Sequence, residues 1–259
     1  MKTNYIFIKE LAKQNFINVF IKAKSKLMLY LIITLLFGFL ALISYLLRTT
    51  LTEYFVFLGA SDILPQLFYI IYTAIALFIS IYGCDALIIS GKEKDIYLSF
   101  PVSPFSLIIA KILPTYLINL IIAFFTVFVP LLSDIKDVGF IFLLALTFVL
   151  PLFPMALSTL WVYFKSLFPK TDTKPLKLIN ATVFLAFLVL LTIIGSRCFN
   201  LLKDNAYQLT ASISKYYFPA VFFSSTVKQS SFADFVTLTT LSVAAFYIYL
   251  YVLKKINKL

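Results

Sequence analysis

The sequence predicts an all-α, polytopic membrane protein with six transmembrane helices and cytoplasmic N- and C-termini. Three observations lead to this fold class. The 259 residues are 62% hydrophobic and 13% charged, with a mean hydropathy of +1.00, and a soluble core of this size cannot bury so much apolar surface. The apolar residues fall in long blocks. The lysines and arginines concentrate in alternate connections between those blocks.

The first 26 residues are expected to form an amphipathic helix in the headgroup plane. Lysines occupy the remaining faces and favour contact with anionic membrane lipid. A solvated basic arm is the alternative for this segment. The apolar positions recur every three to four residues, at Tyr5, Ile8, Ala12, Phe16 and Val19.

Residues 27–259 are expected to form one transmembrane domain of six spans, each reaching the roughly 20 apolar residues needed to cross the hydrocarbon core. Pro114 lies inside the third span, and Pro151 and Pro154 lie inside the fourth. Because proline removes a helix hydrogen bond and clashes with the preceding turn, we expect kinks there. The spans are expected at about 27–47, 63–90, 105–132, 138–164, 178–197 and 234–253.

The distribution of charge sets the expected orientation. With the N-terminus inside, the inner segments hold 16 lysines against four acidic residues, the outer segments hold six basic and six acidic residues, and Asp85 lies near the inner end of the second span. This is the positive-inside bias of a multi-pass protein of the cell membrane. It accounts for the formal net charge of +11 without a basic patch, so we expect no nucleic-acid partner.

A polar segment at residues 91–104 interrupts the apolar pattern between the second and third expected spans. Gly91 suits the end of a helix, and Ser103 followed by Pro104 suits the start of the next. Between them the chain can form about two turns of amphipathic helix under the membrane, serving as a docking surface for a partner. An ordinary intracellular loop is the alternative. The docking residues would be Lys92, Glu93, Lys94, Asp95, Ile96, Tyr97, Leu98 and Ser99.

The longest outer connection, residues 198–233, is too aromatic for a flexible linker. We expect one or two short helices that enter the outer interface. They would either pack over the outer helix ends or line an exit path.

The chain carries little catalytic chemistry. It has no histidine, which excludes serine–histidine and cysteine–histidine catalysis and HExxH metal sites, and we expect no bound metal. Its glycines never form GxxxxGK[ST], so we expect no ATP bound by this chain and no enzyme activity of its own.

Two polar residues are candidates for intramembrane function. Asp85 is expected near the inner end of the second span, where a buried acid is costly and is a functional candidate. Anchoring of that helix end, with Lys94 in reach, is the alternative. Asn119 lies in the third span, and it marks either a site or close helix packing.

Two stretches resemble bacterial ABC transporter permeases of the exporter (type 2) class. They are DIYLSFPVSPFSLIIAK, Asp95 to Lys111, and LPLFPMALSTLW, Leu150 to Trp161. The layout of six spans with a polar segment after the second is similar to that family over nearly the whole chain.

The resemblance implies that Lys92–Ser99 is a coupling helix docked on a separate ABC ATPase subunit, and that residues 1–26 are an interfacial connecting helix. ATP and Mg²⁺ would be bound by that partner. Similar sequences also occur in permeases of about twice this length, which implies that this chain pairs as a homodimer or with a second six-span permease. The implied mechanism is alternating access driven by ATP.

Other classes of function stay open at this point. A membrane interaction or immunity protein without transport activity would have the same composition. A secondary carrier or channel would need polar residues at mid-membrane, of which the spans offer few.

Overall fold

The computed structural model describes residues 26–57, 63–82, 104–132, 137–166 and 216–256, together with Val189 and Ile193. Every regular element in these ranges is helical, as the sequence predicts. The elements are α2 (Lys26–Phe57), α3 (Leu64–Tyr82), α5 (Pro104–Ala123), η3 (Phe124–Phe128), α6 (Val129–Leu131), α7 (Asp137–Val149), α8 (Leu152–Leu157), α9 (Thr159–Ser166), α11 (Phe218–Gln229) and α12 (Phe232–Ile256).

Five helical stretches in the described residues are long and apolar enough to cross a membrane. Helices satisfy their own backbone hydrogen bonds, which is the condition for a single segment to cross lipid. The expected span at 178–197 lies outside the described residues except for Val189 and Ile193, both of which are helical. The five stretches are Phe37–Phe57, Leu64–Ile81, Phe105–Leu131, Gly139–Tyr163 and Phe232–Ile256.

The expected end of the first span at residue 47 is wrong for the helix itself, because α2 continues for ten more residues to Phe57. The polar residues after this point do not stop the helix, since their side chains bond within it. The Thr49 hydroxyl donates to the Tyr45 carbonyl at 3.1 Å, and the Thr50 hydroxyl donates to the Leu46 carbonyl at 2.5 Å. The extension then buries Phe55 against the rest of the protein.

The third span keeps its helix through Pro114, and its irregular turn lies further on, in the π-helix η3. There the Val129 N–H donates to the Phe124 carbonyl, five residues back. The next residue, Pro130, has no N–H and its ring would crowd the carbonyl of Thr126 in a regular α-helix. The wider π turn relieves that clash, and α6 completes the span.

The fourth span is divided into α7, α8 and α9, and the first of its two interruptions includes Pro151, one of the two prolines where the sequence predicts kinks. The first interruption falls at Leu150 and Pro151, and the second at Ser158. The backbone remains bonded across both, since the Met155 N–H donates to the Pro151 carbonyl at 3.3 Å and the Val162 N–H donates to the Ser158 carbonyl at 3.0 Å. The three pieces therefore form one bent rod.

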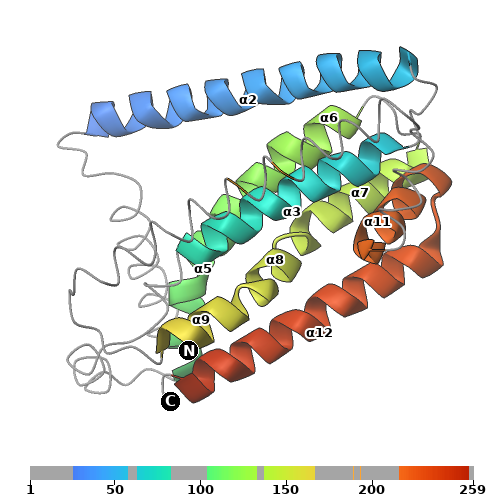
Figure 1. The fold of residues 1–259 in the computed structure, drawn as a ribbon. Coiled ribbons are helices and arrows are strands. Elements are labelled where there is room, and N and C mark those ends of the chain that lie inside the picture. The colour runs from blue at the N-terminus through green and yellow to red at the C-terminus, as the bar shows by residue number, and fades with distance from the viewer. Residues whose placement is uncertain are drawn as a thin grey trace.

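In Figure 1, α3, the rod of α5, η3 and α6, the rod of α7 to α9, and α12 run side by side as a bundle. The short helix α11 packs at one end of the bundle against α3, α7 and α12. The long helix α2 runs along the outside and contacts α3, η3 and α6.

Two apolar clusters fill the bundle. The cluster at the α11 end, which we call the end cluster, joins α2, α3, α5 to α7, α11 and α12, and its largest buried side chains include Phe55, Phe68, Tyr69, Tyr72, Phe223 and Leu238. The second cluster joins the other ends of α5, α8, α9 and α12 through Ile108, Ile112, Met155, Val162, Tyr249 and Leu253.

A two-residue turn joins α11 to α12. Ser230 takes the left-handed backbone conformation, with φ of 52°, and closes α11. Ser231 then caps α12, because its hydroxyl accepts the Asp234 N–H at 3.4 Å. The turn reverses the chain so that α11 lies back against the first half of α12.

Replacing Ser231 with alanine should remove this cap. We expect Ser231→Ala to lower the free energy of unfolding by about 1 kcal/mol, measured by denaturation in detergent micelles. Thr237→Ala is the matched control, since the Thr237 hydroxyl bonds only to the Ala233 carbonyl of its own exposed helix surface. An equal loss from both variants would contradict the capping role.

Candidate functional site

A cluster of hydroxyl-bearing side chains lies inside the end cluster, where α3 meets the start of α11. Tyr72 and Thr73 lie three and four residues after Tyr69, so each lies on the same side of α3 as Tyr69. Tyr217, the N-cap residue of α11, approaches this side of the helix. We call these four residues the tyrosine cluster.

A hydrogen bond joins Tyr217 to Thr73 within the tyrosine cluster, and Thr73 bonds in turn to the backbone of its own helix. The Tyr217 hydroxyl donates to Thr73 Oγ1 at 3.1 Å, and Thr73 Oγ1 donates to the Ile70 carbonyl at 3.0 Å. These hydrogen bonds therefore tie Tyr217, the N-cap residue of α11, to α3 within apolar surroundings.

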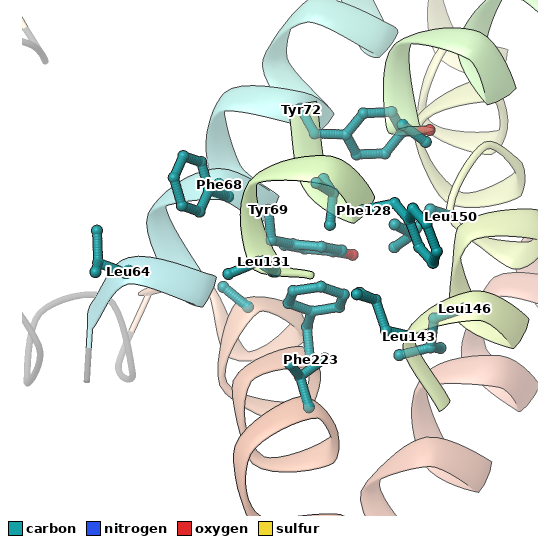
Figure 2. Packing of buried hydrophobic residues seen from close by; sticks show 14 of the residues in the cluster. Leu64, Phe68, Tyr69, Tyr72, Phe128, Leu131, Leu143, Leu146, Leu150 and Phe223 are labelled. Atoms are coloured by element: carbon teal, nitrogen blue, oxygen red, sulfur yellow. The ribbon is translucent and has the colours of Figure 1, made fainter. Parts of the chain in front are cut away.

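Two aromatic rings pack against the ring of Tyr69. Its ring stacks on Phe223 of α11 with centroids 5.0 Å apart, and the Tyr217 ring lies 5.9 Å away. Figure 2 shows Tyr69 directly above Phe223, with Phe68 and Leu131 around them. The Tyr69 side chain thus packs against both the N-cap residue of α11, Tyr217, and a residue in its second turn, Phe223.

The chemistry of the tyrosine cluster is that of neutral hydrogen bonding. Burial raises the pKa of Tyr217, so its hydroxyl stays protonated and able to donate at physiological pH. Among the residues that the structure describes, no group of three histidine, cysteine or acidic side chains could hold a metal ion. The cluster can bind or tether a polar group, and it has no activated nucleophile.

The hydroxyl of Tyr72 has no hydrogen-bond partner among the described residues, although the side chain is fully buried. The Tyr116 hydroxyl donates to the Phe148 carbonyl at 2.9 Å, just before the first interruption of the fourth span. Tyr116 therefore ties α5 to the bent rod.

Asn119 forms a separate polar contact between α3 and α5. Its Nδ2 donates to Ser80 Oγ at 2.9 Å, and Ser80 Oγ donates to the Ala76 carbonyl at 2.8 Å. Both side chains are buried, and Asn119 Oδ1 has no partner in the part of the chain that the structure describes. The two helices that flank the polar segment 91–104 are thus joined by a buried hydrogen bond.

Replacing Asn119 with leucine separates a structural role from a functional one. Leucine has a similar volume, removes the unpartnered Oδ1, and leaves the Ser80 hydroxyl bonded to Ala76. Because interhelical hydrogen bonds in membranes average about 0.6 kcal/mol, we expect Asn119→Leu to change the free energy of unfolding by less than about 1 kcal/mol. A loss above about 2 kcal/mol in micelles would show that Asn119 is needed for packing.

The other residues singled out in the sequence are not placed. Asp85 and the segment Lys92–Ser99 lie outside the described residues, as do residues 1–25 and 198–215. Asn119 is the one sequence candidate that the structure places, and it lies apart from the named members of the tyrosine cluster.

The sequence analysis missed the tyrosine cluster. The spacing of Tyr69, Tyr72 and Thr73 signals a shared helix side, and that signal was available. Their partner Tyr217 is 144 residues away from Thr73, and no local pattern specifies such a contact. Comparison with protein-family models, with curated proteins and with solved structures yields no match to this chain.

Proposed function

We propose that this chain is the membrane subunit of an ATP-driven ABC exporter in the cell membrane. It would cross the membrane six times with both termini in the cytoplasm and form half of a translocation path. Its partners would be an ABC ATPase subunit and a second six-span permease, identical or different. ATP and Mg²⁺ would bind to the ATPase, so the chain itself would have no enzyme activity.

The polar segment 91–104 is the observation that carries this proposal. It lies between two apolar spans, has four consecutive charged residues from Lys92 to Asp95, and continues into the LSFPVS stretch that resembles exporter permeases. The excess of lysines in the inner segments supports a cytoplasmic location for it. A soluble ATPase can reach this segment only on that side.

The helices on either side of the segment are suited to transmit its motion. The Asn119–Ser80 hydrogen bond joins α5 to α3, and the Tyr116 hydroxyl joins α5 to the bent rod. A pull on segment 91–104 would therefore move α3 and α5 together. That motion would re-pack the bundle when two ATPase subunits close on ATP.

The test is purification of the tagged chain from its native membranes. We expect an ATPase with a GxxxxGK[ST] motif and no membrane span to copurify. The double variant Lys92→Glu, Lys94→Glu should reduce its recovery at least tenfold, because the loss of charge-assisted contacts costs about 1.5–3 kcal/mol.

The matched control reverses two lysines that are exposed at the end of α12, in the variant Lys254→Glu, Lys255→Glu. It should leave the recovery of the ATPase unchanged. The proposal fails if no ATPase copurifies with the wild-type chain, or if the two double variants behave alike.

A further inference from the structure

The helix α11 is too short to cross a membrane. Its 12 residues span about 18 Å, against about 30 Å for a hydrocarbon core. Its sequence ends in a polar half, with Ser224, Ser225, Thr226, Lys228 and Gln229 among the last six residues. A short helix of this composition can lie in the interface when it is not packed in the bundle.

Two polar side chains of α11 bond to the backbone of their own helix. The Ser225 hydroxyl donates to the Val221 carbonyl at 3.0 Å, and the Thr226 hydroxyl donates to the Phe222 carbonyl at 2.7 Å. These bonds stay intact if the helix moves as one body. The Tyr217 hydroxyl, at the N-cap of α11, donates a hydrogen bond across to Thr73 Oγ1 of α3.

Apolar contacts supply the remainder of the α11 packing. Ala220, Phe223 and Val227 recur at three- and four-residue intervals and enter the end cluster from one side of the helix. Phe223 stacks on Tyr69. The second cluster contains no α11 residue, so it would stay packed if α11 moved away.

We propose that α11 is a lid on the end of the bundle, which undocks from α3 and α7 as one unit by turning about Ser230 and Ser231. The hydrogen bond from Tyr217 to Thr73 is the latch that holds the lid closed. Opening the lid uncovers the α3 side that bears Tyr69 and Tyr72. This motion is a property of the fold and does not depend on an ATPase or a substrate.

The test measures thiol reactivity on the buried side of the lid. The native cysteines Cys84 and Cys198 are first replaced with serine. Ala220→Cys then places a thiol on α11, and Ala123→Cys places a control thiol on α5. Both alanines are fully buried in the end cluster. The full-length protein in lipid nanodiscs is labelled with a water-soluble maleimide.

Adding Tyr217→Phe should raise the labelling rate of the Ala220→Cys variant about five- to tenfold and leave that of the Ala123→Cys variant unchanged, because the latch hydrogen bond is lost. Thr73→Val removes the acceptor of the same hydrogen bond and should have the same effect. It replaces Tyr217→Phe in the experiment if that variant does not fold. Tyr116→Phe, which removes a hydrogen bond to Phe148 elsewhere in the bundle, should not change labelling of either thiol.

Two results would overturn the lid. If both thiols become more reactive together, the latch variants loosen the whole bundle and α11 does not move separately. If neither Tyr217→Phe nor Thr73→Val changes the labelling of the Ala220→Cys variant, the hydrogen bond between Tyr217 and Thr73 does not hold α11 in place.

Discussion

Replacing Tyr69 with alanine is expected to destabilise the protein by about 3–5 kcal/mol, the largest effect of any single change considered in this protein. The side chain is 1% exposed, and its ring fills the space between Phe223 and Tyr217. Truncation would leave a cavity that rigid helices cannot close, and it would remove the stacking of the ring on Phe223. Denaturation of the purified protein in micelles measures the change in the free energy of unfolding.

Two matched variants divide this effect into its parts. Tyr69→Phe keeps the ring and loses only the hydroxyl, so the expected cost is about 1 kcal/mol. Tyr247→Ala removes a tyrosine that is 73% exposed on α12, and its expected cost is below about 0.5 kcal/mol. If Tyr69→Ala costs no more than Tyr247→Ala, the packing at the tyrosine cluster is not as the structure has it.

Phe55→Ala is expected to have the second-largest effect, a loss of about 3 kcal/mol. Phe55 is 1% exposed and is the buried α2 member of the end cluster, with Leu51 and Tyr54 packed beside it. Its loss should free the second half of α2 from α3 and α6. Protease sensitivity of the chain near residue 57 should rise together with the loss of stability.

Phe57→Ala is the control for that result. Phe57 lies two residues further along the same helix but is 86% exposed, so its truncation should change the free energy of unfolding by less than about 0.5 kcal/mol. Equal effects at positions 55 and 57 would mean that α2 is not anchored to the bundle through one side.

The sequence predicts the helical spans well because lipid leaves few alternatives. A long apolar segment must form a helix to satisfy its backbone, so length and hydropathy locate α3, α12 and the rods from α5 to α6 and α7 to α9. The prolines at 151 and 154 also predict the region where the fourth span is interrupted. These features depend on local sequence alone.

Features that depend on contacts between distant segments were not predictable. The continuation of α2 beyond residue 47 depends on the burial of Phe55 in a cluster built by later helices. The turn of η3 lies before Pro130, at the end of the third span, and Pro114 leaves its helix uninterrupted. The Tyr217–Thr73 contact joins an aromatic outer segment to the second span.

The residues of the candidate site were likewise only partly predictable from the sequence. Asn119 is conspicuous in the sequence because polar amides are rare in spans, and the structure gives it a partner on α3. Tyrosines are abundant in this chain, 16 in all, so the sequence did not distinguish Tyr69, Tyr72 and Tyr217 from those that face lipid. Burial and partners identify them in the fold.

In-cell photo-cross-linking from position 97 is the measurement that tests the central proposal most directly. A photoreactive amino acid in place of Tyr97 lies within the polar segment that would dock on the ATPase. We predict a cross-link to an ATP-binding subunit at this position, and none from the same probe in place of Tyr247, which is exposed on α12. Failure of position 97 to cross-link to any cytoplasmic protein, or its labelling by an impermeant reagent from outside the cell, would contradict the account.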